Sequence, residues 1–131
     1  MIPALFIGHG SPMNALEENE YKQGWWDIAK SIGKPSAILS VSAHWYTGHT
    51  GICTLEKPRL IYDFYGFPRA LYQLDYPAAG SPAFAGEALS LLNGKASEDN
   101  SWGLDHGTWC VLRTMYPEAN IPVFQMSINN T

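Results

Sequence analysis

The chain has 131 residues, of which 46% are hydrophobic and 15% are charged, and it carries a net charge of −4. This length fits a single domain, and the apolar content is too high for an intrinsically disordered chain. Nucleic acid is a poor partner, because the chain has no run rich in Lys or Arg. A membrane is a poor partner as well, because the longest apolar run is much shorter than the roughly 18 residues that a membrane span needs.

The first forty residues have the pattern of a strand–helix–strand unit. Apolar residues 4–7 predict a short buried strand, and residues 37–42 predict a second one. Between them, Asn19 is a suitable N-cap for a helix whose apolar residues recur at three- and four-residue steps and which ends at Gly33. Because the crossover in such a unit is right-handed, the two strands are expected to be parallel neighbours.

The middle of the chain alternates short elements with loops. Residues 51–56 predict a short strand, and residues 57–68 predict a loop that is unusually rich in aromatic residues. A loop of this composition is typical of a pocket lid or a subunit contact. The Ser-Pro pair at 81–82 predicts the start of a helix, and the Asn-Gly pair at 93–94 predicts its end.

The last third predicts a helix over residues 108–116 and a buried strand over residues 121–128. Together these elements predict an α/β fold with a mostly parallel sheet and flanking helices. A parallel sheet needs cover on both faces, and no helix follows the last predicted strand. The pattern therefore predicts a chain truncated after a strand, which forms a homo-oligomer or associates with a chain that supplies the second half.

Two of the four histidines follow predicted strands. His9 lies between two glycines just after the first strand, and His44 follows the second. The carboxyl ends of parallel neighbours meet at one edge of a sheet, where α/β proteins bind ligands, so these side chains are expected to converge. Two imidazoles there predict a metal site, and zinc, iron and manganese all accept imidazole. His49 lies in a polar turn and is expected to be exposed and inert.

His106 lies in a loop just before the helix predicted over residues 108–116. Three roles are open for it: a third metal ligand, a general acid or base beside the metal, or a cap of the following helix. In an alternative interpretation, a carboxylate such as Asp105 joins His9 and His44 around zinc in a hydrolase or isomerase. In another, the chain keeps the fold but has lost its catalytic activity.

The two cysteines, Cys53 and Cys110, are far apart and form no Cys-x-x-Cys pair, which predicts free thiols in a reduced, cytoplasmic protein. Other motifs are absent from the sequence. It has no Gly-x-Ser-x-Gly elbow, no P-loop and no His-Glu-x-x-His, which disfavours a serine hydrolase, a P-loop nucleotide site and a zincin-type protease. No basic leader with a small-residue cleavage site begins the chain, so no signal peptide is predicted.

Four motifs follow one another along the chain: Gly8-His9-Gly10-Ser11-Pro12, Ser42-Ala43-His44-Trp45, Tyr62-Asp63-Phe64-Tyr65-Gly66-Phe67-Pro68 and Trp102-Gly103-Leu104-Asp105-His106-Gly107. With these four motifs in this order, the sequence resembles the DOPA-dioxygenase-type extradiol ring-opening dioxygenases of the LigB-like superfamily. The resemblance covers essentially the whole chain. It implies an enzyme that uses non-haem Fe(II), with Zn(II) possible in the same site, to cleave a catechol-like ring beside its two hydroxyls with both atoms of O2.

The resemblance also implies residue roles. His9 and His44 match the first two metal ligands of the family, and His106 matches a catalytic histidine near the substrate. The residues expected to contact the substrate are Trp45, Tyr65, Phe67 and Asp105. Family members are about twice as long, and their remaining ligand has no match here. Residues 1–131 are therefore expected to be the N-terminal part of a single catalytic domain, with weak metal binding and little turnover alone.

Overall fold

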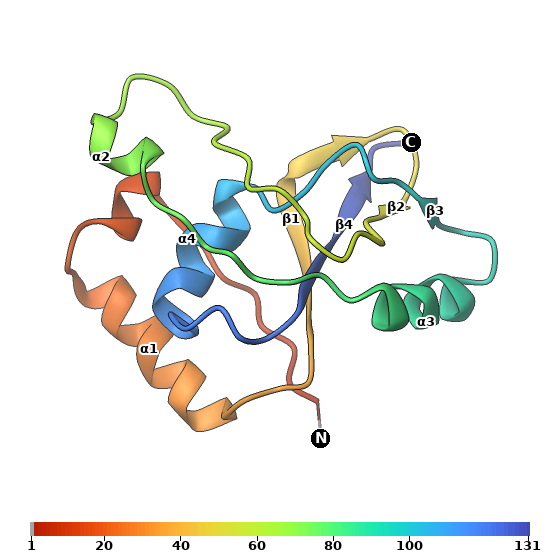
Figure 1. Ribbon diagram of the computed structural model, residues 1–131, viewed down its shortest axis with the longest axis horizontal. Coiled ribbons are helices and arrows are strands. Elements are labelled where there is room, and N and C mark those ends of the chain that lie inside the picture. Colours follow the sequence, from red (N-terminus) through yellow and green to blue (C-terminus); the bar gives the residue numbers. More distant parts are fainter. Residues whose placement is uncertain (1) are drawn as a thin grey trace.

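The computed structural model describes residues 2–131, which form an α/β fold around a four-stranded sheet (Figure 1). The strand order is β1-β4-β2-β3, and the two long strands, β1 (Ile38–Thr47) and β4 (Val123–Asn129), are parallel neighbours. The short β2 (Gly51–Ile52) pairs antiparallel with β4 and parallel with β3 (Ser97–Glu98). The predicted class, α/β with a mostly parallel sheet and flanking helices, is confirmed.

The two helices predicted from end signals form close to where the sequence places them. Helix α1 (Glu20–Ile32) begins after Asn19, whose side chain accepts a hydrogen bond from the third residue of the helix, and ends at Gly33. Helix α3 (Pro82–Leu92) begins after Ser81, whose hydroxyl caps it in the same way. Local capping chemistry therefore sets both starts, because each cap satisfies a backbone N–H that has no partner inside the helix.

Helix α4 (His106–Met115) starts two residues earlier than predicted. The Asp105 carboxylate accepts a hydrogen bond from the Gly107 N–H at 3.0 Å, so Asp105 is the N-cap and His106 becomes the first helical residue. Two further short helices, η1 (Pro12–Ala15) and α2 (Arg69–Tyr72), lie on the side of α4 that faces away from the sheet (Figure 1). The earlier start of α4 matters because it fixes the backbone of a candidate site residue.

Two apolar clusters lie on opposite faces of the sheet. The larger joins α1 and α4 to the sheet and includes Trp25, Trp109 and Val123. The smaller joins α3 to β4 through Ala85 and Phe124. Val123 and Phe124 are adjacent in one strand, so their side chains point to opposite faces. Helices therefore cover both faces of the sheet at β4.

The strand predicted over residues 4–7 is wrong. Residues 2–10 form no strand, and Leu5 and Phe6 are 48% and 103% exposed. The predicted pairing of this segment with residues 37–42 is wrong as well, since the parallel neighbour of β1 is β4. An apolar run becomes a strand only when a neighbouring backbone accepts and donates its hydrogen bonds, and this segment has no such neighbour among residues 2–131.

Strand β1 continues past its predicted end at residue 42 and carries His44 within it. Its register against β4 shifts between Val41, which pairs with Met126, and Tyr46, which pairs with Ile128. Extra residues of β1 are therefore accommodated in a bulge, a feature that bends a strand and redirects its side chains. His44 lies in this bulge, so its position depends on the pairing of β1 with β4.

Residues 53–68 form an irregular loop in place of most of the strand predicted over residues 51–56. An isolated parallel bridge between Leu60 and Leu104 ties this loop to the segment that precedes α4. Backbone hydrogen bonds hold the bridge, from the Leu104 N–H to the Arg59 carbonyl at 2.9 Å and from the Ile61 N–H to the Leu104 carbonyl at 2.8 Å. The aromatic loop is thereby held against the start of α4.

Cys53 and Cys110 are buried and free, as the sequence predicts. Burial raises the pKa of the Cys110 thiol to about 12, so this thiol stays protonated and is a poor nucleophile. Within residues 2–131, no helix combines the length and the apolar character that crossing a membrane would require.

Candidate metal centre

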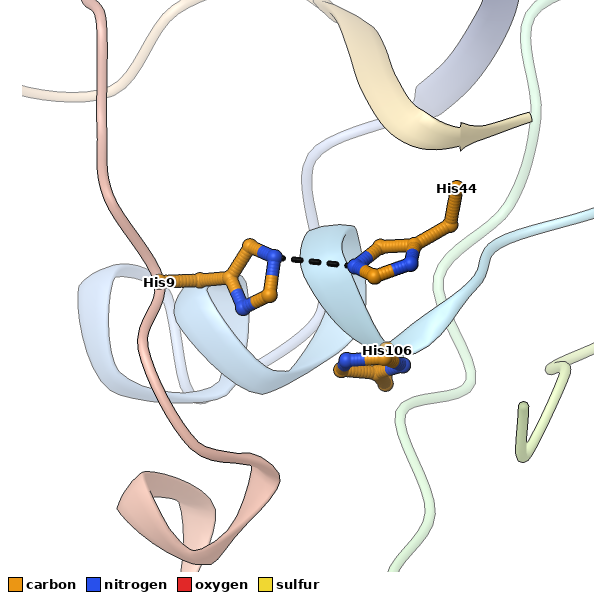
Figure 2. A group of neighbouring side chains, drawn as sticks. All are labelled: His9, His44 and His106. Carbon is orange, nitrogen blue, oxygen red and sulfur yellow. Dashed lines mark hydrogen bonds between the residues drawn. The ribbon is translucent and has the colours of Figure 1, made fainter. Parts of the chain in front are cut away.

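Three histidines from distant parts of the chain meet at one point. Figure 2 shows His9 on the N-terminal segment, His44 on β1 and His106 at the start of α4. Their candidate ligand nitrogens all lie within 4.8 Å of one another. The structure thus brings His9 and His44 together as the sequence predicts, although His9 does not come from a strand. It also places His106 with them, which the sequence left open.

The space for His44 depends on a glycine in the first turn of α4. A Cβ atom at Gly107 would lie 2.9 Å from Cδ2 of the His44 ring and 3.0 Å from Oγ of Ser42. Both distances are shorter than ordinary van der Waals contact. Glycine at this position therefore lets the bulge of β1 approach the helix closely enough to join His44 to His106.

Asp63 holds the ring of His106. Its Oδ1 accepts hydrogen bonds from the backbone N–H of His106 at 3.0 Å and from ring Nδ1 at 2.9 Å. Its Oδ2 lies 3.7 Å from Nδ1 of His44, which is too far for a direct hydrogen bond. A carboxylate beside Nδ1 places the ring proton there, so Nε2 of His106 keeps its lone pair. His106 is 5% exposed, so burial and Asp63 together fix its orientation.

The charge states of the site follow from these contacts. Burial raises the pKa of the Asp63 carboxyl, but the hydrogen bonds from His106 lower it by more than burial raises it. The pKa of Asp63 therefore lies below its usual value. Burial, followed by the neighbouring His106, lowers the pKa of His9. Asp63 is therefore ionised and His9 is neutral near pH 7. A neutral imidazole is the form of histidine that binds a metal ion.

The nitrogen geometry fits a shared divalent ion. Nδ1 of His9 faces the carbonyl of Gly10 at 2.9 Å, so it carries the ring proton and leaves Nε2 as an acceptor. That Nε2 lies 2.9 Å from Nε2 of His44. Two imidazole nitrogens at about 2.1 Å from one ion and at right angles to each other are about 3 Å apart. Without an ion, the same distance fits a hydrogen bond donated by His44.

Asp105 lies behind the histidines and points into the protein. It is fully buried, and its carboxylate accepts hydrogen bonds from Ser42 Oγ at 2.7 Å, Trp102 Nε1 at 2.9 Å and Gln125 Nε2 at 3.0 Å, besides the Gly107 N–H. These contacts link β1, β4 and α4. They occupy both oxygens, so the structure does not support the alternative in which Asp105 completes a zinc site.

The aromatic residues expected to contact a substrate have different surroundings. Trp45 is 3% exposed and stacks on another tryptophan. Tyr65 is 94% exposed on the loop that carries Asp63. Phe67, on the same loop, packs edge to face on Phe64 with the ring centroids 5.5 Å apart. Of these residues, Tyr65 is the most exposed and Phe67 is partly exposed.

Sequence reasoning missed Asp63 and Phe64 as site residues. Asp63 bonds His106 directly, and the ring of Phe64 lies edge-on to the His106 ring at 5.6 Å. One signal was available, because Asp63 is the only charged residue in the aromatic motif at 62–68. A carboxylate among aromatic residues is costly to bury unless a specific partner is present. Its partner could not be named without the structure.

His49 lies outside the cluster. Its Nε2 bonds the Asp99 carboxylate at 2.8 Å, and its side chain is 49% exposed, as the sequence predicts. The Asp99 carboxyl also accepts hydrogen bonds from Ser101, and these interactions hold its pKa below its usual value. His49 therefore provides a matched control for tests of the other three histidines.

Comparison with known proteins matches residues 3–131 to the family described as the catalytic LigB subunit of aromatic ring-opening dioxygenase. The chain belongs to this LigB family. The resemblance drawn from its four motifs is thereby confirmed at the level of the family. The match spans His9, His44 and His106, so the cluster lies within the part of the chain that defines the family membership.

Relatives of this LigB chain support the same conclusion. The 4,5-DOPA dioxygenase extradiol of Escherichia coli K12 is 49% identical over 132 residues, which cover 99% of this chain and 49% of the relative. The protein of the same name from Beta vulgaris is 42% identical over 133 residues, which cover 95% of this chain and 49% of that relative. The crystal structure of an uncharacterized Escherichia coli K12 protein matches with a TM-score of 0.71 and 41% identity, over 91% of this chain and 44% of that one. The chain spans about half the length of the curated relatives it matches.

Proposed function

We propose that this LigB-family chain forms the metal-binding part of an extradiol dioxygenase that cleaves a catechol-like ring with O2. The observation that carries the proposal is the convergence of three histidines whose ligand nitrogens lie within 4.8 Å of one another. Relatives that are called 4,5-DOPA dioxygenase extradiol support an aromatic diol as the substrate class. The rest of the active site belongs to the half of the relatives' length that this chain does not match.

His9 and His44 are the metal ligands in this proposal. Their Nε2 atoms approach to 2.9 Å, and His9 is held by the Gly10 carbonyl with its lone pair toward His44. The imidazole donor set fits Fe(II) and also accepts Zn(II). A bound Fe(II) would supply Lewis acidity toward the two phenolic oxygens and redox chemistry toward O2.

His106 is the catalytic acid and base in this proposal. Because Asp63 bonds Nδ1, Nε2 is the nitrogen of His106 that accepts a phenolic proton of the diol and returns it later. The Asp63 carboxylate then stabilises the imidazolium that forms, as a carboxylate does behind other catalytic histidines. Because His106 is 5% exposed, little solvent competes for this proton.

The substrate ring is flanked by the loop that carries Asp63. Tyr65 and Phe67 are the proposed substrate contacts from this loop, and Phe64 limits the space beside His106. Trp45 and Asp105, which were expected to contact the substrate too, have internal partners. In the proposal they act on the substrate only by holding β1 and α4 in position.

Anaerobic Fe(II) titration tests the proposed ligands. His9→Ala and His44→Ala are each expected to weaken binding at least about 100-fold, because each removes one of two assigned ligand atoms, a larger change than loss of a residue that only supports a ligand. His49→Ala, a surface histidine outside the cluster, is expected to leave the affinity unchanged. Equal Fe(II) affinity in all three variants would show that His9 and His44 are not the metal ligands.

The reaction class is tested with labelled oxygen. The Fe(II)-loaded chain is incubated with DOPA (3,4-dihydroxyphenylalanine) under 18O2, and the products are analysed by mass spectrometry. A ring-opened product that contains both labelled atoms supports the dioxygenase. A product without label supports a hydrolase or isomerase. Metal binding without any product supports a chain that keeps the fold and lacks catalysis in the absence of the unmatched half.

His106→Gln separates the ligand role of this residue from the acid and base role. The variant is expected to keep Fe(II) binding within about tenfold of the native chain, because the proposal assigns no ligand atom to His106. Any turnover should fall by about 100-fold or more, since a positioned acid and base contributes that much. Loss of Fe(II) binding would instead make His106 the third ligand. The titration decides between these roles even where turnover is low.

A further inference from the structure

A pocket away from the histidine cluster lies between helices α1 and α4. The two helices pack against each other (Figure 1), and the pocket lies where the first half of α1 passes the last turn of α4. Its volume is about 320 Å³, which is within the range of small-molecule sites. Its residue Thr114 is about 12 Å further along α4 than His106, at 1.5 Å per residue. The pocket is therefore separate from the candidate metal centre.

The lining of this pocket is positively charged, although the chain carries a net charge of −4. Its charged residues are two cations, Lys22 and Arg113, and one anion, Glu18. A third cation, Lys30, lies 4.8 Å from the ring centroid of Trp26, which also lines the pocket. A concave surface with this charge favours an anion as its ligand.

Arg113 has no carboxylate partner among residues 2–131. Its Nε donates a hydrogen bond to the carbonyl of Asp75 at 3.1 Å, and its Nη1 lies 3.5 Å from the carbonyl of Ala15. These carbonyls orient the guanidinium without neutralising its charge. A carboxylate is a suitable partner for it, because two carboxylate oxygens match the planar donors of a guanidinium.

Lys22 has a partner that a ligand could replace. Its Nζ lies 3.0 Å from the Glu18 carboxylate, and the Glu18 side chain is 88% exposed. An ion pair this open to solvent contributes only about 0–1 kcal/mol, because water screens it. A ligand carboxylate that also bonds Arg113 therefore displaces Glu18 from Lys22 at little cost.

The pocket also has an apolar wall. Trp26 lines it together with Ala15 and Pro117. The indole presents a flat surface, and flat rings stack on such a surface in an offset arrangement. An anion with a flat apolar body therefore matches this lining better than inorganic phosphate, which has no apolar part.

Thr114 contributes a hydroxyl that lacks a partner. Its Oγ1 is buried, and among residues 2–131 it is the only buried side-chain nitrogen or oxygen without a hydrogen bond. Such groups are rare in native structures and require an explanation. Threonine in a helix uses two χ1 rotamers, so a rotation about χ1 changes the direction of the hydroxyl without moving the backbone. A ligand oxygen in the pocket that Thr114 lines would give the hydroxyl a partner.

We propose that this pocket binds a small aromatic carboxylate. Arg113 and Lys22 hold the carboxylate, and the hydroxyl of Thr114 donates a hydrogen bond to it. Trp26 stacks on the aromatic ring. The proposal rests on the residues that line the pocket, and it does not depend on the reaction proposed for the metal centre.

Nuclear magnetic resonance titration of the metal-free chain tests the proposal. The probes are benzoate, its neutral analogue benzamide, and inorganic phosphate, which is an anion without a ring. Benzoate should shift the amides of residues 22–26 and 113–114 and the indole N–H of Trp26, with a dissociation constant of about 1 mM. Benzamide and phosphate should each bind at least about tenfold more weakly, because each lacks one of the two recognised features.

Variants assign the contacts. Arg113→Gln and Lys22→Gln should each weaken benzoate binding at least about tenfold, because each removes a cation that bonds the carboxylate. Thr114→Val keeps the shape of the side chain and should weaken binding about threefold or more. It should not lower the stability, since the native hydroxyl has no bond to lose. Lys57→Gln, at an exposed lysine outside the pocket, is the control and should bind benzoate as the native chain does.

The amide spectrum of each variant shows whether it is folded, and Lys22→Gln provides a test that leaves the carbonyl bonds of Arg113 in place. The proposal is overturned if benzoate shows no saturable binding, or if benzamide or phosphate binds as tightly as benzoate. Shifts centred on His9 and His106 would assign the benzoate to the metal centre instead. Unchanged binding in both folded cation variants would also overturn the proposal.

Discussion

Replacing Asp105 by alanine is expected to lower the free energy of unfolding by about 3–5 kcal/mol. Asp105 is fully buried and accepts four hydrogen bonds, two of them from the buried side chains of Ser42 and Gln125. Alanine leaves these donors without partners and removes the N-cap of α4. Each unsatisfied buried group costs about 1–3 kcal/mol, and loss of the cap costs about 1 kcal/mol.

Urea denaturation followed by tryptophan fluorescence measures this effect. Asp105→Asn should be less damaging than alanine, because the amide oxygen still accepts two hydrogen bonds, although the amide nitrogen then faces the other two donors. Asp27→Ala is the control, since the native residue is an exposed helical carboxylate bonded to Gln23 alone, and it should change the stability by less than about 0.5 kcal/mol. A loss below about 1 kcal/mol for Asp105→Ala would show that this network does not stabilise the fold.

Replacing Gly103 by alanine is expected to destabilise the chain by about 3 kcal/mol. A Cβ atom at this position would lie 2.1 Å from the Arg59 carbonyl oxygen, and a backbone atom cannot move aside as the end of a flexible side chain can. The Arg59 carbonyl accepts the hydrogen bond of the Leu104 N–H in the bridge that holds the aromatic loop. The substitution therefore forces the loop away from the start of α4.

Two measurements check the Gly103 substitution. The midpoint of urea unfolding should fall, and Fe(II) affinity should fall with it, because the displaced loop carries Asp63, the partner of His106. Gly86→Ala is the matched control, since a Cβ there meets nothing within 4 Å and alanine is favoured over glycine within a helix. Unchanged stability in Gly103→Ala would mean that the bridge relaxes without cost.

Elements that depend on nearby residues could be predicted from the sequence. The caps Asn19 and Ser81 locate the starts of α1 and α3, because a cap side chain bonds a backbone N–H three residues ahead. Strand β4 and most of α4 follow from their apolar patterns. The same local reasoning fails for residues 4–7, because whether an apolar run forms a strand is decided by a neighbouring backbone.

The residues of the candidate site could likewise be predicted only in part from the sequence. The sequence identifies His9, His44 and His106 as residues of interest through the short motifs around them. It does not reveal Asp63 as the partner of His106, because 43 residues separate the two and only the bridge between their segments brings them to 2.9 Å.

The sequence by itself determined the fold class, the starts of α1 and α3 and the family, since these depend on local patterns and on motifs in order. The tertiary structure alone decided that His106 joins the other two histidines and that residues 2–7 stay outside the sheet. The first outcome requires the bulge of β1 to approach Gly107 of α4, and the second reflects the lack of a neighbouring strand. Both are long-range contacts, whose formation depends on the whole packed structure and cannot be read from a few consecutive residues.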